Sequence, residues 1–141
     1  MKNGVICDID HTLSIPTDRD TFDFINSLKD KINPFIYSII SKIDTSTTSL
    51  LIVTGREEKF KAITKEFLIK NNITYHSLFM RKNGDYRSNE IIKKEIFIDL
   101  IKPKWNILYT LDDNIETVKM YNSELGLNSL LVKNSTSNHN G

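Results

Sequence analysis

The segment "VICDIDHTLS", residues 5–14, places an apolar run directly before two carboxylates that are separated by one residue. The apolar run predicts a buried strand, and Asp8 and Asp10 follow at its carboxyl end, where strand alternation directs both side chains to one side. Two carboxylates so close repel each other unless a cation lies between them or one is protonated. They suggest a hard metal ion such as Mg²⁺, although a lone "DxDxT" more often only caps a helix or turn.

The composition describes an ordinary globular chain. Its 141 residues predict one domain, with a formal net charge of +1 and 26% charged residues, so a strongly basic nucleic-acid coat or an acidic tail is excluded. The apolar run at the start is too short for a signal peptide or a membrane span, so we expect a soluble, cytoplasmic chain. Cys7 is the single cysteine, which excludes an internal disulfide and a cysteine zinc cluster.

Short runs rich in Ile, Val and Leu alternate with helical patterns along the chain. Strands are predicted at 4–7, 50–53, 75–80, 106–111 and 129–132. Helices are predicted at 57–71, 88–102 and 114–125, with two more inside 20–43 and Pro34 in the first turn of the second. This alternation predicts an α/β domain, a doubly wound, Rossmann-like parallel sheet of about five strands with helices on both faces. The domain spans 1–133, and the polar residues 134–141 form a flexible tail.

Three further motifs fall at strand ends or at helix starts. Thr54, Gly55 and Arg56 follow an apolar run, where a hydroxyl and free amide groups at a helix N-terminus would bind phosphate oxygens. A second acidic pair in "LYTLDDN" could complete a magnesium shell, and Lys93 lies on the helix between these motifs. Because ligands bind beyond the carboxyl ends of such sheets, we expect these residues to meet at one place.

With "DIDHT", "TGR", the lysine of "IIKKEIF" and "LDDN" in this order, the chain resembles the haloacid dehalogenase superfamily of phosphotransferases from about residue 4 to 132. The resemblance implies that Asp8 is the nucleophile and Asp10 the general acid and base. It implies that Thr54 binds the phosphoryl group and that Lys93, rather than Lys94, stabilises its charge. The implied cofactor is Mg²⁺, and the expected metal ligands are Asp8, Asp10, Asp112 and Asp113.

A closer similarity lies in "LFMRKNGDYRSNEIIKKEIF", residues 78–97, which looks like the 3'-phosphatase domain of phage polynucleotide kinase-phosphatases. It implies a phosphatase that removes 3'-phosphates from nucleic-acid ends through an aspartyl-phosphate. The partner is then a phosphorylated nucleic-acid end. The expected substrate-binding residues are Thr12, Gly55, Arg56, Arg81 and Arg87.

Two residues depart from the pattern of these families. His11 stands where the superfamily usually carries glycine, so the loop after Asp10 is stiffer, or the imidazole assists near the phosphate, or the residue has no catalytic role. Asn89 stands where the phage pattern has an acidic residue. An amide there can cap the helix but cannot hold a lysine by charge.

The spacing of the motifs leaves no room for a large cap domain. About 40 residues separate Thr12 from Thr54, and fewer separate Arg56 from Lys93, so we expect an open site that admits a macromolecular end. Local positive charge could follow a phosphate backbone. The basic residues concerned are Arg81, Lys82, Arg87, Lys93, Lys94, Lys102 and Lys104. A solvated helix face explains Lys102 and Lys104 equally well. Tyr86 and Trp105 could stack on bases, although packing explains Trp105 better.

Two other functions fit parts of the sequence. One is a capless phosphatase of nucleotides or sugar phosphates, with oligomerisation supplying a lid. The other is a phosphoacceptor receiver domain, in which an acidic pair comes first and the accepting Asp ends a later strand, an order that this chain does not have. No GxxxxGK[ST] motif is present, so a 5'-kinase activity is absent or supplied by another polypeptide. The sequence leaves the choice between DNA and RNA and the oligomeric state open.

Overall fold

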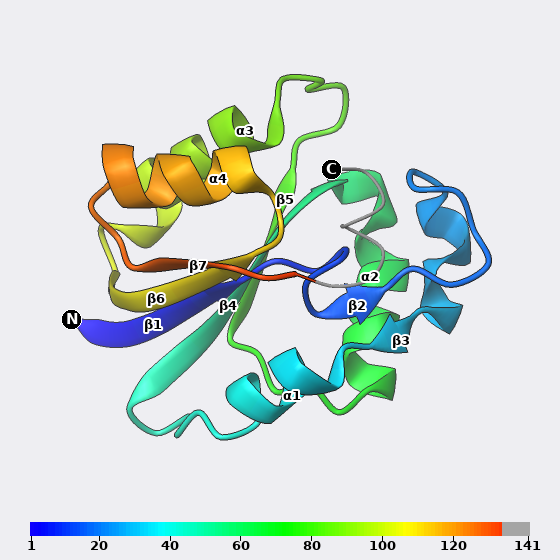
Figure 1. The fold of residues 1–141 in the computed structure, drawn as a ribbon, viewed down its shortest axis with the longest axis horizontal. Coiled ribbons are helices and arrows are strands. Elements are labelled where there is room, and N and C mark those ends of the chain that lie inside the picture. Colours follow the sequence, from blue (N-terminus) through cyan, green and yellow to red (C-terminus); the bar gives the residue numbers. More distant parts are fainter. Residues whose placement is uncertain (134–141) are drawn as a thin grey trace.

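The strand that contains Val5 lies in the middle of a five-stranded parallel sheet. The computed structural model describes residues 1–133, and the predicted flexible tail, 134–141, lies outside the described residues. The strand order is β5-β4-β1-β6-β7 (Figure 1). The strands are β1 (Lys2–Cys7), β4 (Thr48–Glu57), β5 (Ser77–Arg81), β6 (Trp105–Asp112) and β7 (Ser129–Leu131). The predicted parallel sheet of about five strands is therefore confirmed.

The register of β1 with its two neighbours sets the position of the site. Val5 pairs with Leu50 of β4 on one side and with Tyr109 of β6 on the other. Beyond the end of β1, the backbone N–H of Asp8 still donates to the carbonyl of Leu111, at 3.0 Å. The carboxyl ends of β1 and β6 consequently lie side by side, and so do the acidic residues that follow them.

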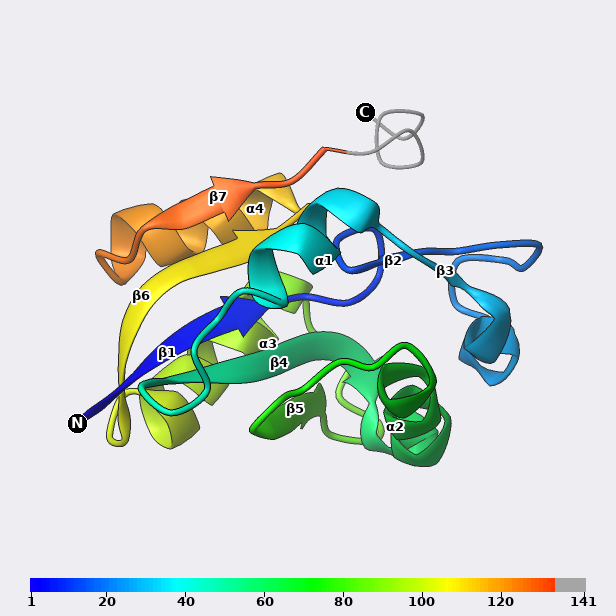
Figure 2. The ribbon, with the colours of Figure 1, turned by 90° about the horizontal axis from the view of Figure 1, so that it is seen from below.

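Helices cover both faces of the sheet (Figures 1 and 2). One face carries α1 (Pro34–Ile40) and α2 (Lys61–Lys70), and the other carries α3 (Asn89–Ile96) and α4 (Ile115–Lys119). Short helical turns extend or precede them: η1 (Phe24–Lys29), η2 (Glu58–Phe60), η3 (Phe97–Ile101) and η4 (Met120–Glu124). Doubly wound packing of this kind buries the central strands on both sides.

Alternation along the strands divides the core into two clusters. Val5 and Cys7 pack on the side of α1 and α2, whereas Ile6 packs on the side of α3 and η4. Cys7 is fully buried, and burial, with the nearby charge of Asp8, raises the pKa of its thiol well above the ordinary value. A small structural strand residue, as expected, describes Cys7 better than a reactive thiol.

The segment 20–43 differs in part from the prediction. The second helix begins at Pro34, and the Asn33 side chain caps it by accepting from the Phe35 N–H at 3.1 Å. The first helix is only the turn η1. In the sequence it lies between two short strands, β2 (Ser14–Ile15) and β3 (Lys31–Ile32), which form a small antiparallel pair. Strands of two residues are too short to show an alternating pattern, so this pair could not be predicted.

A second difference concerns β4. The strand was expected to stop at the Thr-Gly-Arg motif and open a helix there, but it continues to Glu57, and α2 begins at Lys61. Gly55 and Arg56 therefore lie in an irregular part of β4, where the pairing with β5 shifts between Thr54 and Glu57, and not at a helix N-terminus. Among the described residues, no helix is both long and apolar enough to cross a membrane.

Candidate active site

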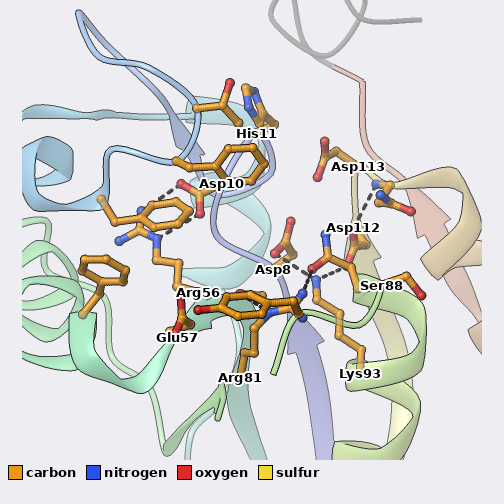
Figure 3. A pocket seen from close by; sticks show the side chains of 18 of the residues that line it. Asp8, Asp10, His11, Arg56, Glu57, Arg81, Ser88, Lys93, Asp112 and Asp113 are labelled. Atoms are coloured by element: carbon orange, nitrogen blue, oxygen red, sulfur yellow. Dashed lines mark hydrogen bonds and ion pairs between the residues drawn. The ribbon is translucent and has the colours of Figure 1, made fainter. Parts of the chain in front are cut away.

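Lys93 lies at the centre of the acidic residues that end β1 and β6. Its Nζ donates to Asp8 Oδ1 at 3.0 Å and to Asp112 Oδ2 at 2.7 Å, and all three side chains are almost fully buried (Figure 3). Burial opposes the charge of Lys93, but Asp112 and Asp8 outweigh it and raise the pKa of Lys93 well above its usual range. The neighbouring Lys94 instead faces solvent and pairs with Glu124 at 2.7 Å, so the structure separates the two lysines as expected.

Three carboxylates form a compact group beside this lysine. One oxygen from each of Asp8, Asp112 and Asp113 lies within 4.8 Å of the others. Burial first, and then the charge of Asp8, raise the pKa of Asp112 to about 6 and that of Asp113 to about 8. One ammonium group does not balance three carboxylates, of which Asp8 and Asp112 are buried and Asp113 is partly buried. Clustered oxygen donors with excess negative charge suit a hard divalent cation such as Mg²⁺, so the residues present fit that ion.

Thr12 belongs to this acidic group. Its side chain is fully buried, and its hydroxyl oxygen lies 3.0 Å from Asp8 Oδ2 and 3.3 Å from Asp113 Oδ1. A hydroxyl carries a single proton, so it donates to one of the two carboxylates at a time. The sequence prediction gave Thr12 to the substrate, whereas its observed contacts are with the two carboxylates.

Asp10 lines the same cavity but turns away from the acidic group. Arg56 donates to its two oxygens at 2.9 and 2.8 Å, and Arg19 donates to Oδ1 at 2.9 Å. Asp30 holds Arg19 from the other side at 2.7 Å. Burial alone would raise the pKa of Asp10, but the hydrogen bonds and charge of Arg56, with those of Arg19, lower it. The Asp10 carboxylate is thus an arginine-bound anion in this arrangement and lies outside the group formed by Asp8, Asp112 and Asp113, so its expected role as a metal ligand stays a prediction.

Arg56 is a structural residue in this arrangement. It is 1% exposed, and besides Asp10 it donates to the hydroxyls of Ser27 (3.1 Å) and Thr64 (3.0 Å). The guanidinium also packs over the ring of Phe24, with its central carbon 4.9 Å from the ring centroid. The predicted direct contact of Arg56 with substrate is therefore not what the geometry shows, because each nitrogen of its guanidinium already has a protein acceptor.

Thr54 and Gly55 occupy different environments although they are adjacent. Thr54 is buried, its hydroxyl accepts from the Arg56 N–H at 3.2 Å, and it is not among the residues that line the cavity. Gly55 does line the cavity. A Cβ on Gly55 would lie 2.2 Å from Oδ1 of Asn89, so only glycine fits without displacing that side chain.

Arg81 organises the loop between β5 and α3. It donates to the Gly55 carbonyl at 2.7 Å, to Asn89 Oδ1 at 2.6 Å, and to the carbonyls of Asp85 (2.9 Å) and Arg87. Asn89 thus supports Arg81, and it makes no side-chain cap of α3. These bonds use four of the five guanidinium N–H groups, so the predicted substrate contact by Arg81 can use the second N–H of Nη2.

Arg87 is held by two carboxylates. It donates to both oxygens of Asp85, at 2.9 and 2.8 Å, and to both of Glu95, each at 2.8 Å. Hydrogen bonds from Arg87 lower the pKa of Asp85 to about 2, and hydrogen bonds to Asp85 and Glu95 raise the pKa of Arg87. These exposed pairs fix the loop geometry more than they add stability.

The cavity above the acidic group has a volume of about 740 Å³, which is ample for a nucleotide. Figure 3 shows Asp8, Asp112, Asp113 and Lys93 meeting at one end and Asp10 with Arg56 at the other. His11 also lines the cavity, with a φ of 63°. Glycine enters this left-handed region without strain, so His11 holds a backbone conformation that the glycine expected at this position would adopt more easily.

The predicted basic cluster divides into two groups. Arg81, Arg87 and Lys93 line the cavity, whereas Lys82 and Lys94 do not. Lys102 and Lys104 precede β6, whose carboxyl end carries Asp112, so they lie at the opposite edge of the sheet from the site. For these two residues the solvated face is the better description. Trp105 is buried and donates to the Ser49 hydroxyl at 3.1 Å, so it packs in the core as expected.

Sequence reasoning missed two residues that hold Asp10. Arg19 and Asp30 lie in polar loop sequence with no periodicity, and their contacts depend on the pairing of distant segments. The exposed Phe22 was also missed. One signal could have indicated them: a carboxylate shielded from solvent requires a cationic partner, and the sequence prediction named no cationic side chain for Asp10.

The fold and the site define a phosphatase of the haloacid dehalogenase type. The model of the "polynucleotide kinase PNKP phosphatase domain" matches residues 2–136. The chain belongs to this family, and the resemblance seen in the sequence is confirmed. Two solved phosphatases share the fold. D,D-heptose 1,7-bisphosphate phosphatase of B. bronchiseptica is 11% identical, with a TM-score of 0.65 over 97% of this chain and 84% of that one. The class C acid phosphatase of Bacillus anthracis is 12% identical, with a TM-score of 0.66 over 96% of this chain and 68% of that one.

Relatives with higher identity are longer than this chain. A chain in the structure of a Pnkp1/Rnl/Hen1 complex is 33% identical, with a TM-score of 0.90 over 94% of this chain and 46% of that one. A chain in a second structure, of the Pnkp1/Rnl/Hen1 RNA repair complex, is 34% identical, with a TM-score of 0.89 over 93% and 42%. A protein of Autographa californica nuclear polyhedrosis virus, named as a bifunctional polynucleotide kinase/RNA ligase, is 26% identical over 84% of this chain and 17% of its own length.

Proposed function

We propose that the chain is a magnesium-dependent phosphomonoesterase that removes 3'-phosphates from nucleic-acid ends through an aspartyl-phosphate on Asp8. The observation that carries the proposal is the buried contact of Asp8 with Lys93 at the base of an open cavity, in a chain of the polynucleotide phosphatase family. Nucleic-acid ends as substrate rest on that family and on the names of the longer relatives.

In the first step, an oxygen of Asp8 attacks phosphorus and the bond to the ester oxygen breaks. The leaving alkoxide takes a proton from Asp10, and the phosphoryl group remains on Asp8 as an acyl phosphate. Water then attacks phosphorus, gives a proton to Asp10 and releases inorganic phosphate, which restores the Asp8 carboxylate and returns Asp10 to its protonated form. Dividing the displacement in this way suits a reaction that is extremely slow without a catalyst.

The environment of Asp10 favours one half of this cycle. Arg56 and Arg19 hold it as an anion with a lowered pKa, so it is in the deprotonated form that can receive a proton from water, but it is a weaker base than a free carboxylate. To act as the acid in the first step, Asp10 has to take up a proton, and loosening of the Arg19 contact on substrate binding would make this easier. Arg19 and Arg56 are therefore positioning residues in the proposed reaction.

Lys93 stabilises the transferring group by its charge. Its ammonium remains protonated because burial is outweighed by two carboxylates, and it lies against the proposed nucleophile. Asp8, Asp112 and Asp113 would hold Mg²⁺, which, when bound, offsets negative charge on the phosphoryl oxygens. Thr12 would orient the carboxylates, and Gly55 leaves room at the cavity wall.

Phosphate release from four substrates tests the function directly. Matched oligonucleotides with a 3'-phosphate or a 5'-phosphate, a mononucleotide and a small sugar phosphate are compared with Mg²⁺ and with EDTA. We expect a higher kcat/KM for the 3'-phosphorylated oligonucleotide and loss of activity in EDTA. Equal or better turnover of the mononucleotide or the sugar phosphate would favour the capless small-substrate phosphatase instead.

A further inference from the structure

Two aromatic side chains stand exposed on the lining of the active-site cavity. Phe22 follows β2 and Tyr86 lies in the loop between β5 and α3, and each is 82% exposed. Phe35 on α1 is similarly exposed, at 79%, but does not line the cavity, so it offers a matched comparison. A single exposed aromatic residue is common on protein surfaces and needs no explanation. Two exposed aromatic residues that line one nucleotide-sized cavity, beside the proposed catalytic carboxylates, suggest a binding function.

The backbone beside each of these rings is fixed by an arginine. Arg19 donates to the carbonyls of Asp20 (3.1 Å) and Thr21 (3.0 Å), the two residues before Phe22. On the other segment, Arg81 donates to the carbonyls of Asp85 and Arg87, which flank Tyr86. Each ring is thus carried on a segment that is already ordered. Binding a ligand between ordered segments costs less conformational entropy than ordering two loops.

The other two phenylalanines of the cavity are occupied by protein neighbours. Phe24 meets Phe22 edge-on at 6.3 Å and Phe60 at 5.4 Å between ring centroids. The guanidinium carbons of Arg56 and Arg19 lie 4.9 and 5.4 Å from its ring centroid. Phe24 therefore serves the internal arginine network, and Phe22 and Tyr86 remain as the aromatic surface presented to a ligand.

We propose that Phe22 and Tyr86 form a stacking subsite for the base of the terminal nucleotide whose phosphate enters the site. The inference rests on the proposed function and specifies its substrate as an end that carries a base. A stacking subsite accepts every base, since each has an aromatic face, and it favours the larger purines. The phosphate is then positioned at Asp8 by contacts to the base as well as by charge.

The test compares two oligonucleotides that differ in one base. Both carry a 3'-phosphate, and in one the terminal nucleotide is abasic. Stacking contributes about 1–3 kcal/mol per base, so we expect the wild-type chain to lose roughly 5- to 150-fold in kcat/KM on the abasic end. In the double variant Phe22→Ala/Tyr86→Ala the ratio should fall to about one. Phe35→Ala removes an equally exposed ring elsewhere and should keep the wild-type ratio.

A second readout does not depend on turnover. In the Asp8→Asn background, an oligonucleotide with terminal 2-aminopurine should lose fluorescence on binding because the base stacks on a protein ring. Adding the two alanine substitutions should abolish this quenching.

The outcomes separate the two proposals. If the wild-type chain hydrolyses both oligonucleotides equally well, or if the double variant keeps the wild-type ratio, the subsite is wrong while the 3'-phosphatase function stands. If the wild-type chain prefers β-glycerophosphate to either oligonucleotide, the proposed function fails and the subsite fails with it.

Discussion

The ammonium group of Lys93 lies 3.0 Å from a carboxylate oxygen of Asp8, 85 residues away in the sequence and buried with it. This contact joins the end of the central strand to a helix on one face of the sheet. It gives the proposed nucleophile a fixed orientation and a counter-charge before any substrate arrives.

The first prediction concerns that nucleophile. Asp8→Asn should abolish phosphate release, because an amide cannot form the acyl phosphate. The fold should survive, since the substitution removes one charge from a crowded acidic group and keeps the shape of the side chain. Activity and circular dichroism of the purified variant provide the check, and measurable turnover in a preparation free of wild-type enzyme would contradict the nucleophile assignment.

The second prediction links pH to metal binding. Asp113 has a pKa of about 8 in the folded chain, against about 4 for an unperturbed carboxyl, so the folded chain holds the proton more strongly. In metal-free buffer, the contribution of Asp113 to the free energy of unfolding should therefore be most favourable below pH 4 and become less favourable as the pH rises towards 8. Mg²⁺ should restore it, most strongly at the alkaline end. Denaturant unfolding at several pH values, with and without Mg²⁺, measures both effects.

Asp113→Asn supplies the control. It should raise the metal-free free energy of unfolding at pH 8 by about 1–3 kcal/mol, because it removes a repelling charge. The same variant should respond little to Mg²⁺. A variant that is less stable without metal, or that gains as much from Mg²⁺ as the wild type, would argue against a metal site at this cluster.

Arg19 should be required for both stability and activity. Arg19→Ala removes the guanidinium that lies 2.7 Å from Asp30 and one of the two arginines that bind Asp10. Arg56 would remain as the cation facing both carboxylates, 3.9 Å from Asp30, so we expect a loss of about 3 kcal/mol. Arg19→Lys keeps the positive charge, but an ammonium group cannot reach both carboxylates and two backbone carbonyls as the planar guanidinium does. This variant should therefore recover only part of the lost free energy of unfolding. Unfolding free energies and a pH profile of kcat for both variants test this. A wild-type profile and stability in Arg19→Ala would refute a positioning role.

Gly55 and Asn89 should show coupled effects. Gly55→Ala places a Cβ 2.2 Å from Asn89 Oδ1, which forces this side chain away from Arg81, at a cost of about 1–3 kcal/mol. In the double variant Gly55→Ala/Asn89→Ala the clash is gone, so the combined loss should be smaller than the sum of the single losses. A double-mutant cycle by thermal or denaturant unfolding gives the coupling energy, and additive losses would contradict the close contact.

The fold could be predicted from the sequence because its strands are short, apolar and separated by helical patterns. The runs at 4–7, 50–53 and 106–111 each form a strand of the central sheet, and the carboxyl-end rule correctly placed Asp8 beside Asp112 and Asp113. The end of β4 was less predictable. The Thr-Gly-Arg motif predicted a helix N-terminus, whereas Gly55 provides space for Asn89 inside a continuing strand.

The hydrogen-bond partners of the cationic residues could not be predicted in the same way. Arg56, Arg81 and Arg87 were assigned to substrate from the resemblance of their motifs to those of phosphatases, and each is held by protein acceptors in the structure. Those acceptors include carbonyls and side chains from segments far apart in the sequence, and Arg19 in particular comes from an irregular loop. Motif spacing fixes the strand ends, but not which guanidinium meets which carboxylate.

The central position of β1 also determines the order in which the site can assemble during folding. This strand pairs with residues 48–52 and 105–111, and Asp112 and Asp113 follow the second of these segments. Contacts of such long sequence separation form slowly. The acidic group therefore comes together only after β6 has paired with β1, so its assembly depends on the slowest contacts of the sheet.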